Sequence, residues 1–225
     1  MTPINAFLSF MERGGLVMWP LLFLSVVTVS IVLERGIFWL RLDSRRGRSR
    51  YRGLAEALRR GDRSRIAGLV DGDDSPYASL ARDLLESTDQ VDEATAAVFS
   101  EEIRPRFERG LLMLSAIVTA APMLGILGTV IGIIQSFELL GGDATITDPN
   151  QVSGGIAEAL ITTATGLVVA LLALFPYMLF RGRQDRAIGR LESLATSAIA
   201  GLAGSRSPKT LIGSSDKRSS DKPRR

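Results

Sequence analysis

One carboxyl group stands alone in a long apolar stretch of the sequence. Glu158 is the only charged residue between positions 149 and 180. A helix turns by about 100° per residue, which puts Gly154, Thr162 and Thr165 on the same face as Glu158. An ionisable group inside a membrane-spanning helix is costly and indicates a functional site. This face therefore combines a carboxyl group with hydroxyl groups and no bulky side chain.

Two less specific roles for Glu158 stay open. The residue comes early in its apolar stretch and can lie at the membrane surface, or it can be a structural carboxyl paired with a hydroxyl. Lipid contact would leave this polar face without partners, so we expect the face to meet protein or water. Thr163 lies about 140° from Glu158 on a straight helix and points elsewhere.

A second apolar stretch carries small residues along one helix face. The stripe consists of Ala121, Gly125, Gly128, Thr129, Gly132 and Ser136. Small side chains let two helix backbones approach closely in a membrane, so we expect most of these residues to pack against another helix. Three glycines of the later stretch have the same expected role: Gly154, Gly155 and Gly166. Thr129 either adds a hydroxyl to a polar path or bonds to its own helix.

The two polar positions are expected at similar depths in the membrane. Thr129 lies about 8–9 Å from the centre of its uncharged stretch, and Glu158 about 10 Å from the centre of its own, at 1.5 Å per residue. Because the two helices are antiparallel, both groups fall in the outer half. The sequence thus predicts a polar site built from two helices, each of which we expect to bend, at Pro122 and at Pro176.

The composition excludes several kinds of chemistry. The 225 residues include no Cys and no His, so thiolate and imidazole metal ligands, a Cys nucleophile and a Ser–His–Asp triad are excluded. We therefore predict that the protein is not an enzyme, has no metal site and needs no cofactor. Any proton movement would have to use carboxylates, hydroxyls and water.

Three stretches are apolar and long enough to cross a bilayer, which takes about 20 residues. They predict an all-α membrane protein with three transmembrane helices, at 14–40, 110–138 and 154–180, and with long helices extending into the cytoplasm. Clustered Arg beside a span marks the cytoplasmic side. The first span is followed by such a cluster: Arg41, Arg45, Arg46, Arg48, Arg50 and Arg52.

The charge pattern orients the remaining segments. Segments 1–13 and 139–153 have few basic residues and are placed outside, so that the N-terminus faces out. Segment 41–109, a helical insert, and segment 181–204, an extension of the last helix, are placed in the cytoplasm. The basic tail at 205–225 has little to bury and is expected to be disordered.

The insert 41–109 holds 14 Arg and 14 acidic residues. Because the charges balance, the Arg cluster is expected to face lipid headgroups rather than nucleic acid. Two short amphipathic helices are predicted on either side of Gly61. A later helix near 91–98 is expected to continue into the second span with a bend near Pro105.

Two motifs together resemble the MotA/TolQ/ExbB proton-channel family. They are APMLGILGTVIG at 121–132 and GIAEALITTATGL at 155–167. The first span with Glu34 and Arg35, and the cytoplasmic insert, also match, so the resemblance covers about 14–202. Three spans and a modest insert are similar to ExbB and TolQ, whereas flagellar MotA-type stators have four spans and a larger cytoplasmic region.

The resemblance implies a function and a set of partners. It implies a homopentamer in the bacterial inner membrane that surrounds helices of a single-span ExbD- or TolR-like partner. Proton flow through this molecular motor would drive protein transport or envelope work through a TonB- or TolA-like protein. The outer side is then the periplasm. The ion is expected to be H⁺, with Na⁺ as the alternative.

The resemblance also assigns the family's polar pore positions to Thr129, Glu158 and Thr163. The helical wheel puts Thr162 beside Glu158 instead, so both threonines are retained as candidates. Two alternative functions remain: a flagellar-type stator subunit, and a non-conducting membrane scaffold in which Glu158 is a packing residue.

Overall fold

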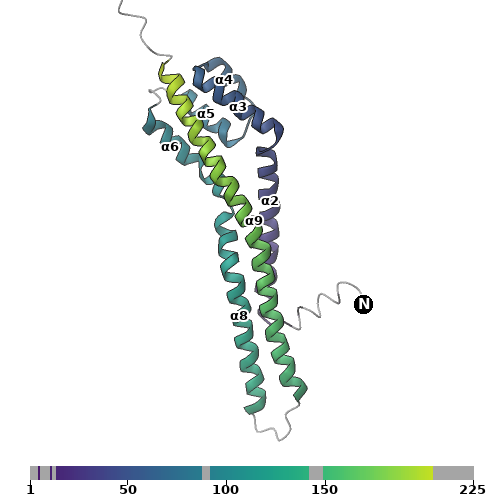
Figure 1. Ribbon diagram of the computed structural model, residues 1–225. Helices are drawn as coiled ribbons and strands as arrows, with labels where there is room; N and C mark the ends of the chain where they lie inside the picture. Colours follow the sequence, from purple (N-terminus) through teal and green to yellow (C-terminus); the bar gives the residue numbers. More distant parts are fainter. Residues whose placement is uncertain (1–4, 6–10, 12–13, 88–91, 142–148, 205–225) are drawn as a thin grey trace, which may run out of the picture. The chain divides into compact units, whose positions relative to one another are not determined.

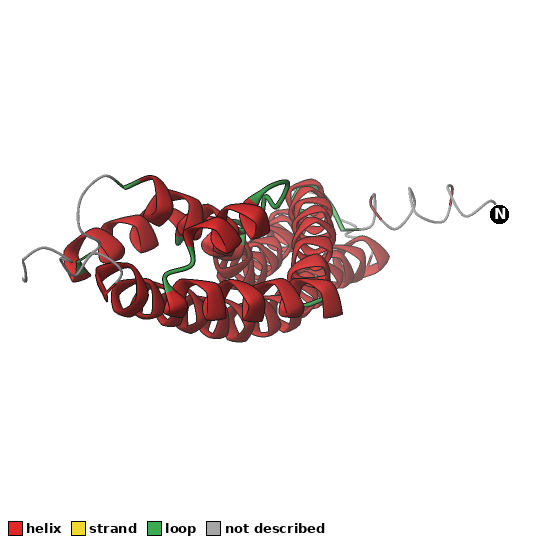
Figure 2. Cartoon of the chain, turned by 90° about the horizontal axis from the view of Figure 1, so that it is seen from above, coloured by secondary structure: helices red, strands yellow, loops and turns green. Residues whose placement is uncertain are grey.

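The computed structural model describes residues 5, 11, 14–87, 92–141 and 149–204. Every regular element in these ranges is a helix, and Figure 2 colours none of the described residues as a strand. The predictions for most of 1–13, for the centre of the 139–153 loop and for the tail 205–225 lie outside the described residues. The described chain forms two compact units.

The first unit contains three long apolar helices. It comprises α2 (Met18–Leu42), α8 (Leu111–Gly141) and the part of α9 (Pro149–Gly204) that precedes Ile188. All three helices are long and apolar enough to cross a membrane. Figure 1 shows α8 and this part of α9 side by side. The prediction of an all-α protein with three membrane-spanning helices is therefore confirmed.

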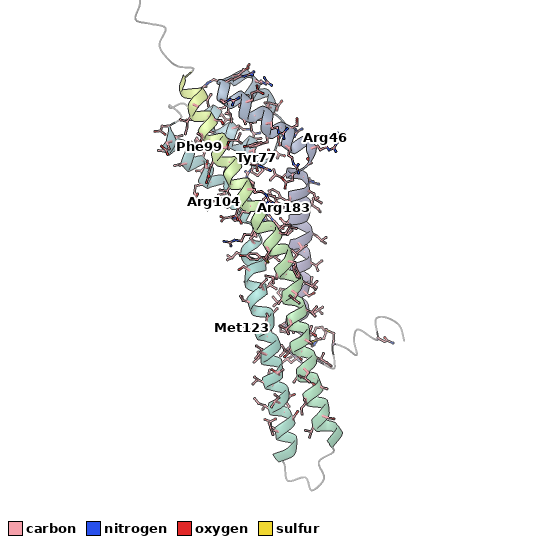
Figure 3. All side chains as sticks on the ribbon, in the orientation of Figure 1. Arg46, Tyr77, Phe99, Arg104, Met123 and Arg183 are labelled. Atoms are coloured by element: carbon pink, nitrogen blue, oxygen red, sulfur yellow. The ribbon has the colours of Figure 1, made fainter. Side chains whose placement is uncertain are left out.

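The surface of the first unit is apolar. Phe23 is 67% exposed, Met123 71% and Phe175 68%. Met123 is labelled on α8 in Figure 3. Large apolar patches of this kind are rare on soluble monomers but are the normal surface of a helix in lipid.

An aromatic cluster packs near the end of α2. Trp39 stacks on Phe107, with 6.2 Å between ring centroids, and the guanidinium of Arg35 lies 5.0 Å from the ring centroid of Phe38. Phe107 belongs to α7 (Pro105–Glu108), which is followed by Gly110 with φ +78°. This left-handed residue, which glycine adopts easily, turns the chain just before α8. The expected continuous helix into the second span is therefore wrong.

The second unit is a small helical bundle. It contains α3 (Arg45–Arg60), α4 (Arg63–Val70), α5 (Pro76–Glu86), α6 (Glu93–Ile103) and the last part of α9. The break between α3 and α4 falls at Gly61, where φ is +68°. Side chains cap the next three helices: Asp62 accepts a hydrogen bond from the Arg65 N–H, Ser75 from Ala78, and Asp92 from Thr95.

Apolar side chains form the core of the second unit. The side chains of Leu58, Ile66, Leu80 and Leu84 are completely buried. Tyr51 packs edge-on against Tyr77, with 5.2 Å between ring centroids; Tyr77 is labelled in Figure 3. Removal of this apolar surface from water is what stabilises the bundle.

Candidate functional site

Helices α8 and α9 contact each other through glycines. A Cβ added at Gly125 would lie 3.0 Å from the Thr163 Cα, and one at Gly166 would lie 2.6 Å from the Ala121 carbonyl oxygen. Both neighbours are backbone atoms that a side chain cannot push aside. The two backbones are therefore in direct contact at this level.

The same close contact continues along the helices. A Cβ on Gly128 would overlap the Thr162 side chain, and one on Gly132 would lie 2.9 Å from the Ala159 Cβ. A Cβ on Gly155 would overlap the Ser136 hydroxyl oxygen. The order of these pairs makes α8 and α9 antiparallel. Gly154 differs from the other predicted packing residues, because a Cβ there would meet nothing within 4 Å.

Threonine hydroxyls bond to backbone carbonyls around this contact. Thr163 Oγ1 donates across the helix pair to the Gly125 oxygen at 2.9 Å. Thr165 Oγ1 donates to Ile161 at 2.8 Å, within its own helix. Thr129 Oγ1 also donates within its helix, to Ile126 at 2.6 Å.

Thr162 connects α9 to the segment that precedes α2. Its hydroxyl lies 3.0 Å from the Gly14 carbonyl oxygen and 2.9 Å from that of Glu158. A hydroxyl has one hydrogen, so these two oxygens compete for it. The side chain of Thr162 is 1% exposed.

Glu158 lies one turn before Thr162 on α9, and the residue as a whole is half-buried. Its carboxyl group lies against Gly15, because a Cβ on that glycine would overlap Glu158 Oε1. Within the described part of the chain, Glu158 forms no ion pair with Lys or Arg. An ionisable group within an apolar helix indicates a functional site.

The structure brings some of the predicted polar residues together and separates others. Glu158 and Thr162 lie together, as expected for residues four apart on a helix. Thr163 faces α8 instead. Thr129 and Glu158 lie at different heights along the helix pair. Gly128, next to Thr129, faces Thr162, whereas Ala159, next to Glu158, faces Gly132. Thr129 and Glu158 are therefore about one turn, or about 5 Å, apart along the helices.

Gly14 and Gly15 are the site residues that sequence reasoning missed. They reach Thr162 and Glu158 from a turn that precedes α2. The signal available in the sequence is a Gly-Gly pair directly before an uncharged stretch. It indicates a turn but does not indicate what the turn contacts.

The remaining candidates lie as follows. Pro122 is inside α8 and Pro176 inside α9, and both helices continue through them. All six residues of the Arg cluster are exposed, and Arg50 Nη1 lies 3.4 Å from an Asp73 carboxylate oxygen. In the described ranges, no group of three or more His, Cys, Asp or Glu side chains is arranged to hold a metal ion.

Comparisons of the amino-acid sequence with known proteins point to one family. Residues 73–193 match the MotA/TolQ/ExbB proton channel family. The chain is 32% identical over 187 residues to the biopolymer transport protein exbB1 of Vibrio cholerae, covering 80% of this chain and 82% of that protein. It is 30% identical over 175 residues to ExbB of Neisseria meningitidis, covering 70% and 77%.

A shorter match connects the chain to the Tol-Pal system. TolQ of Pseudomonas aeruginosa is 39% identical over 92 residues, which is 40% of this chain and 38% of that protein. The fold and site define a membrane protein with a polar position between apolar helices. The chain belongs to the MotA/TolQ/ExbB proton channel family. The relatives in this family are named as biopolymer transport proteins and as a Tol-Pal system protein.

Proposed function

We propose that this chain is the channel-forming subunit of an inner-membrane motor of the ExbB/TolQ type, and not an enzyme. It couples the proton-motive force to energised transport or envelope work. The observation that carries the proposal is Glu158, the only carboxyl in the apolar part of α9, within a family motif and without a described cation partner.

The proposed topology follows the Arg asymmetry. The N-terminus and the 139–153 loop face the periplasm, whereas the second unit and the C-terminus face the cytoplasm. The Arg cluster at the end of the first span then meets lipid headgroups on the cytoplasmic side.

The proposed assembly is a homopentamer that surrounds single-span ExbD- or TolR-like helices and acts through a TonB- or TolA-like protein. Three helices cannot enclose a partner helix, so a central path requires several copies. The similarity to ExbB proteins and to TolQ supports this choice of partners. The similarity to ExbB and TolQ, together with the three apolar helices found among the described residues, supports the ExbB/TolQ branch over a flagellar-type stator.

The proposed mechanism uses Glu158 as the ion carrier. Its carboxyl takes a proton from the outer side and releases it inward through hydroxyls and water. Thr162 lies one turn further along α9 and Thr163 lies at the contact with α8. One charge that crosses 100 mV is worth about 2.3 kcal/mol, which is the driving force available per proton.

The test replaces the carboxyl without changing its shape. Glu158→Gln is expected to assemble normally and to abolish ion-coupled work, because an amide cannot release a proton. Glu158→Asp should retain part of the activity. Glu138→Gln, at an exposed position of α8, is the matched control and should behave as wild type.

The measurements are energised uptake in cells that carry only the variant, and native mass spectrometry of the purified assembly. Full uptake with Glu158→Gln in cells with an intact proton-motive force would make Glu158 a packing residue. The non-conducting scaffold would then be the better assignment.

A further inference from the structure

The turn that precedes α2 is built from Gly14 and Gly15. The Gly14 N–H donates to the Met11 carbonyl at 3.3 Å, and the Met18 N–H donates to the Gly15 carbonyl at 3.2 Å. A Cβ on Gly14 would overlap the Met18 side chain, which is completely buried. The turn is therefore held by its own hydrogen bonds and by a buried residue of α2.

Both glycines of this turn contact the polar face of α9. The Gly14 carbonyl accepts a hydrogen bond from Thr162 Oγ1 at 3.0 Å. Gly15 occupies the space next to the Glu158 carboxyl, where a Cβ would overlap Oε1. These are two separate contacts, made by two neighbouring residues, with two residues that are one turn apart.

Backbone conformation alone does not account for Gly15. Its φ of +64° favours glycine, but Gly72 has φ +65° and a Cβ there would meet nothing within 4 Å. Gly72 needs only the conformational freedom of glycine. Gly15 needs that freedom and also needs to leave room for a carboxyl group.

We propose that the Gly14–Gly15 turn positions the ion-carrying carboxyl: Gly15 leaves the space in which the Glu158 carboxyl lies, and Gly14 fixes the turn against α9 through its hydrogen bond from Thr162, one turn along the helix. The inference rests on the proposed role of Glu158 and extends it to a second segment of the chain. Any movement of the carboxyl towards α2 must displace this turn, so the turn and the carboxyl move together.

The test measures access to the carboxyl directly. A hydrophobic carbodiimide modifies protonated carboxyl groups in apolar surroundings. The full-length protein in lipid vesicles is treated with it, and the rate of modification at Glu158 is followed by fragment mass spectrometry, with Glu138 as the internal reference. This readout does not depend on transport activity.

Gly15→Ala is expected to raise the modification rate at Glu158 several-fold, because the added methyl group displaces the carboxyl from the turn. The control is Gly110→Ala, which also forces a side chain onto a left-handed backbone position in the first unit, at φ +78°. Its Cβ would lie 2.9 Å from Ile31 Cγ2. An unchanged rate in Gly15→Ala, or an equal change in both variants, overturns the proposal.

A second variant tests the other contact without straining the backbone. Thr162→Val removes the hydroxyl that bonds to Gly14 and keeps the shape of the side chain. It should also raise the rate at Glu158. If Gly15→Ala does not assemble, an unchanged rate in Thr162→Val is sufficient to overturn the proposal.

An activity cycle separates this inference from the proposed function. Gly15→Ala should lower energised uptake strongly when residue 158 is Glu, and much less when it is Asp, whose shorter side chain avoids the added methyl group. An equal effect in both backgrounds contradicts positioning by the turn. Full activity of Glu158→Gln, in contrast, contradicts the role of Glu158 as ion carrier. The rate of carbodiimide modification at Glu158 then still tests whether Gly15 contacts the carboxyl.

Discussion

The contact between α8 and α9 and the core of the second unit are built from opposite kinds of residue. Where α8 meets α9, Gly125, Gly132 and Gly166 bring backbones together. In the second unit, side chains such as Leu80 and Leu84 fill the space between helices. The difference follows from the solvent that each region is suited to.

In water, each buried Å² of apolar surface contributes about 25 cal/mol, so large apolar side chains hold helices together. In lipid this gain is absent, and association depends on close packing and on hydrogen bonds between helices. Helix ends follow the same division. Side chains cap α4, α5 and α6, whereas Val17 at the start of α2 makes no side-chain capping bond. Packing alone, without reference to charge, thus indicates that the second unit is suited to water and the α8–α9 contact to lipid.

The largest effect is expected in the core of the second unit. Leu84→Ala removes a completely buried side chain of α5 and should destabilise this unit by about 2–5 kcal/mol. Hydrogen exchange of the full-length protein in bilayers should then speed up in α4 and α5 and stay unchanged in α8. Val98→Ala, at a residue 56% exposed on α6, is the control. Equal acceleration in α8 would show that the two regions unfold as one.

A smaller effect is expected where the membrane helices touch. Gly166→Ala puts a methyl group against backbone atoms of α8 and should cost about 1–3 kcal/mol. Gly154→Ala, on the same helix but facing open space, should be neutral or stabilising, because alanine favours a helix over glycine by about 1 kcal/mol. Thermal unfolding in detergent, followed by the fluorescence of Trp19 and Trp39 in α2, measures both. Equal behaviour of the two variants would contradict backbone contact at Gly166.

The smallest effect concerns a surface charge of the second unit. Burial raises the pKa of the Asp83 carboxyl, and Glu102 and Glu86 raise it further. The unfolded chain therefore loses this proton at lower pH than the folded unit does, so the unit loses stability as pH rises from the ordinary Asp range to the raised value.

Asp83→Asn should remove that loss and leave the second unit slightly more stable at neutral pH, with no gain in acid. The pH dependence of exchange in α5 provides the measurement. Asp74→Asn removes the same formal charge at an exposed position and should give no comparable gain. A stabilisation that persists at low pH would rule out the titration of Asp83 as its cause.

Much of the fold could be predicted from the sequence, because its signals are local. Uncharged stretches mark the three apolar helices, and Gly61 marks a break between two amphipathic ones. The adjacency of Glu158 and Thr162 follows from helical spacing. The break at Gly110 was not predicted, because a single glycine in a sequence does not show whether a helix continues through it.

The rest of the site depends on contacts that spacing does not encode. Thr163 faces α8 because of the rotation of each helix about its own axis. A helical wheel shows which residues of one helix share a face, but it does not show which face meets the other helix. The same register puts Thr129 a turn away from Glu158. Gly14 and Thr162 are 148 residues apart in the chain, so no local pattern could indicate that they meet.

The direction of the threonine hydroxyls has a consequence for the sign of the charge that the site can accept. The hydroxyls of Thr129, Thr162, Thr163 and Thr165 all donate their single hydrogen to backbone carbonyls. What each oxygen still offers is its lone pairs. Of these residues only Thr162 lies with Glu158, one turn along α9, and its oxygen offers lone pairs but no free hydrogen to the space beside the carboxyl. A carboxylate next to such an oxygen attracts a cation or the hydrogen of a water molecule and repels an anion, which is the sign of charge that the proposed ion carrier requires.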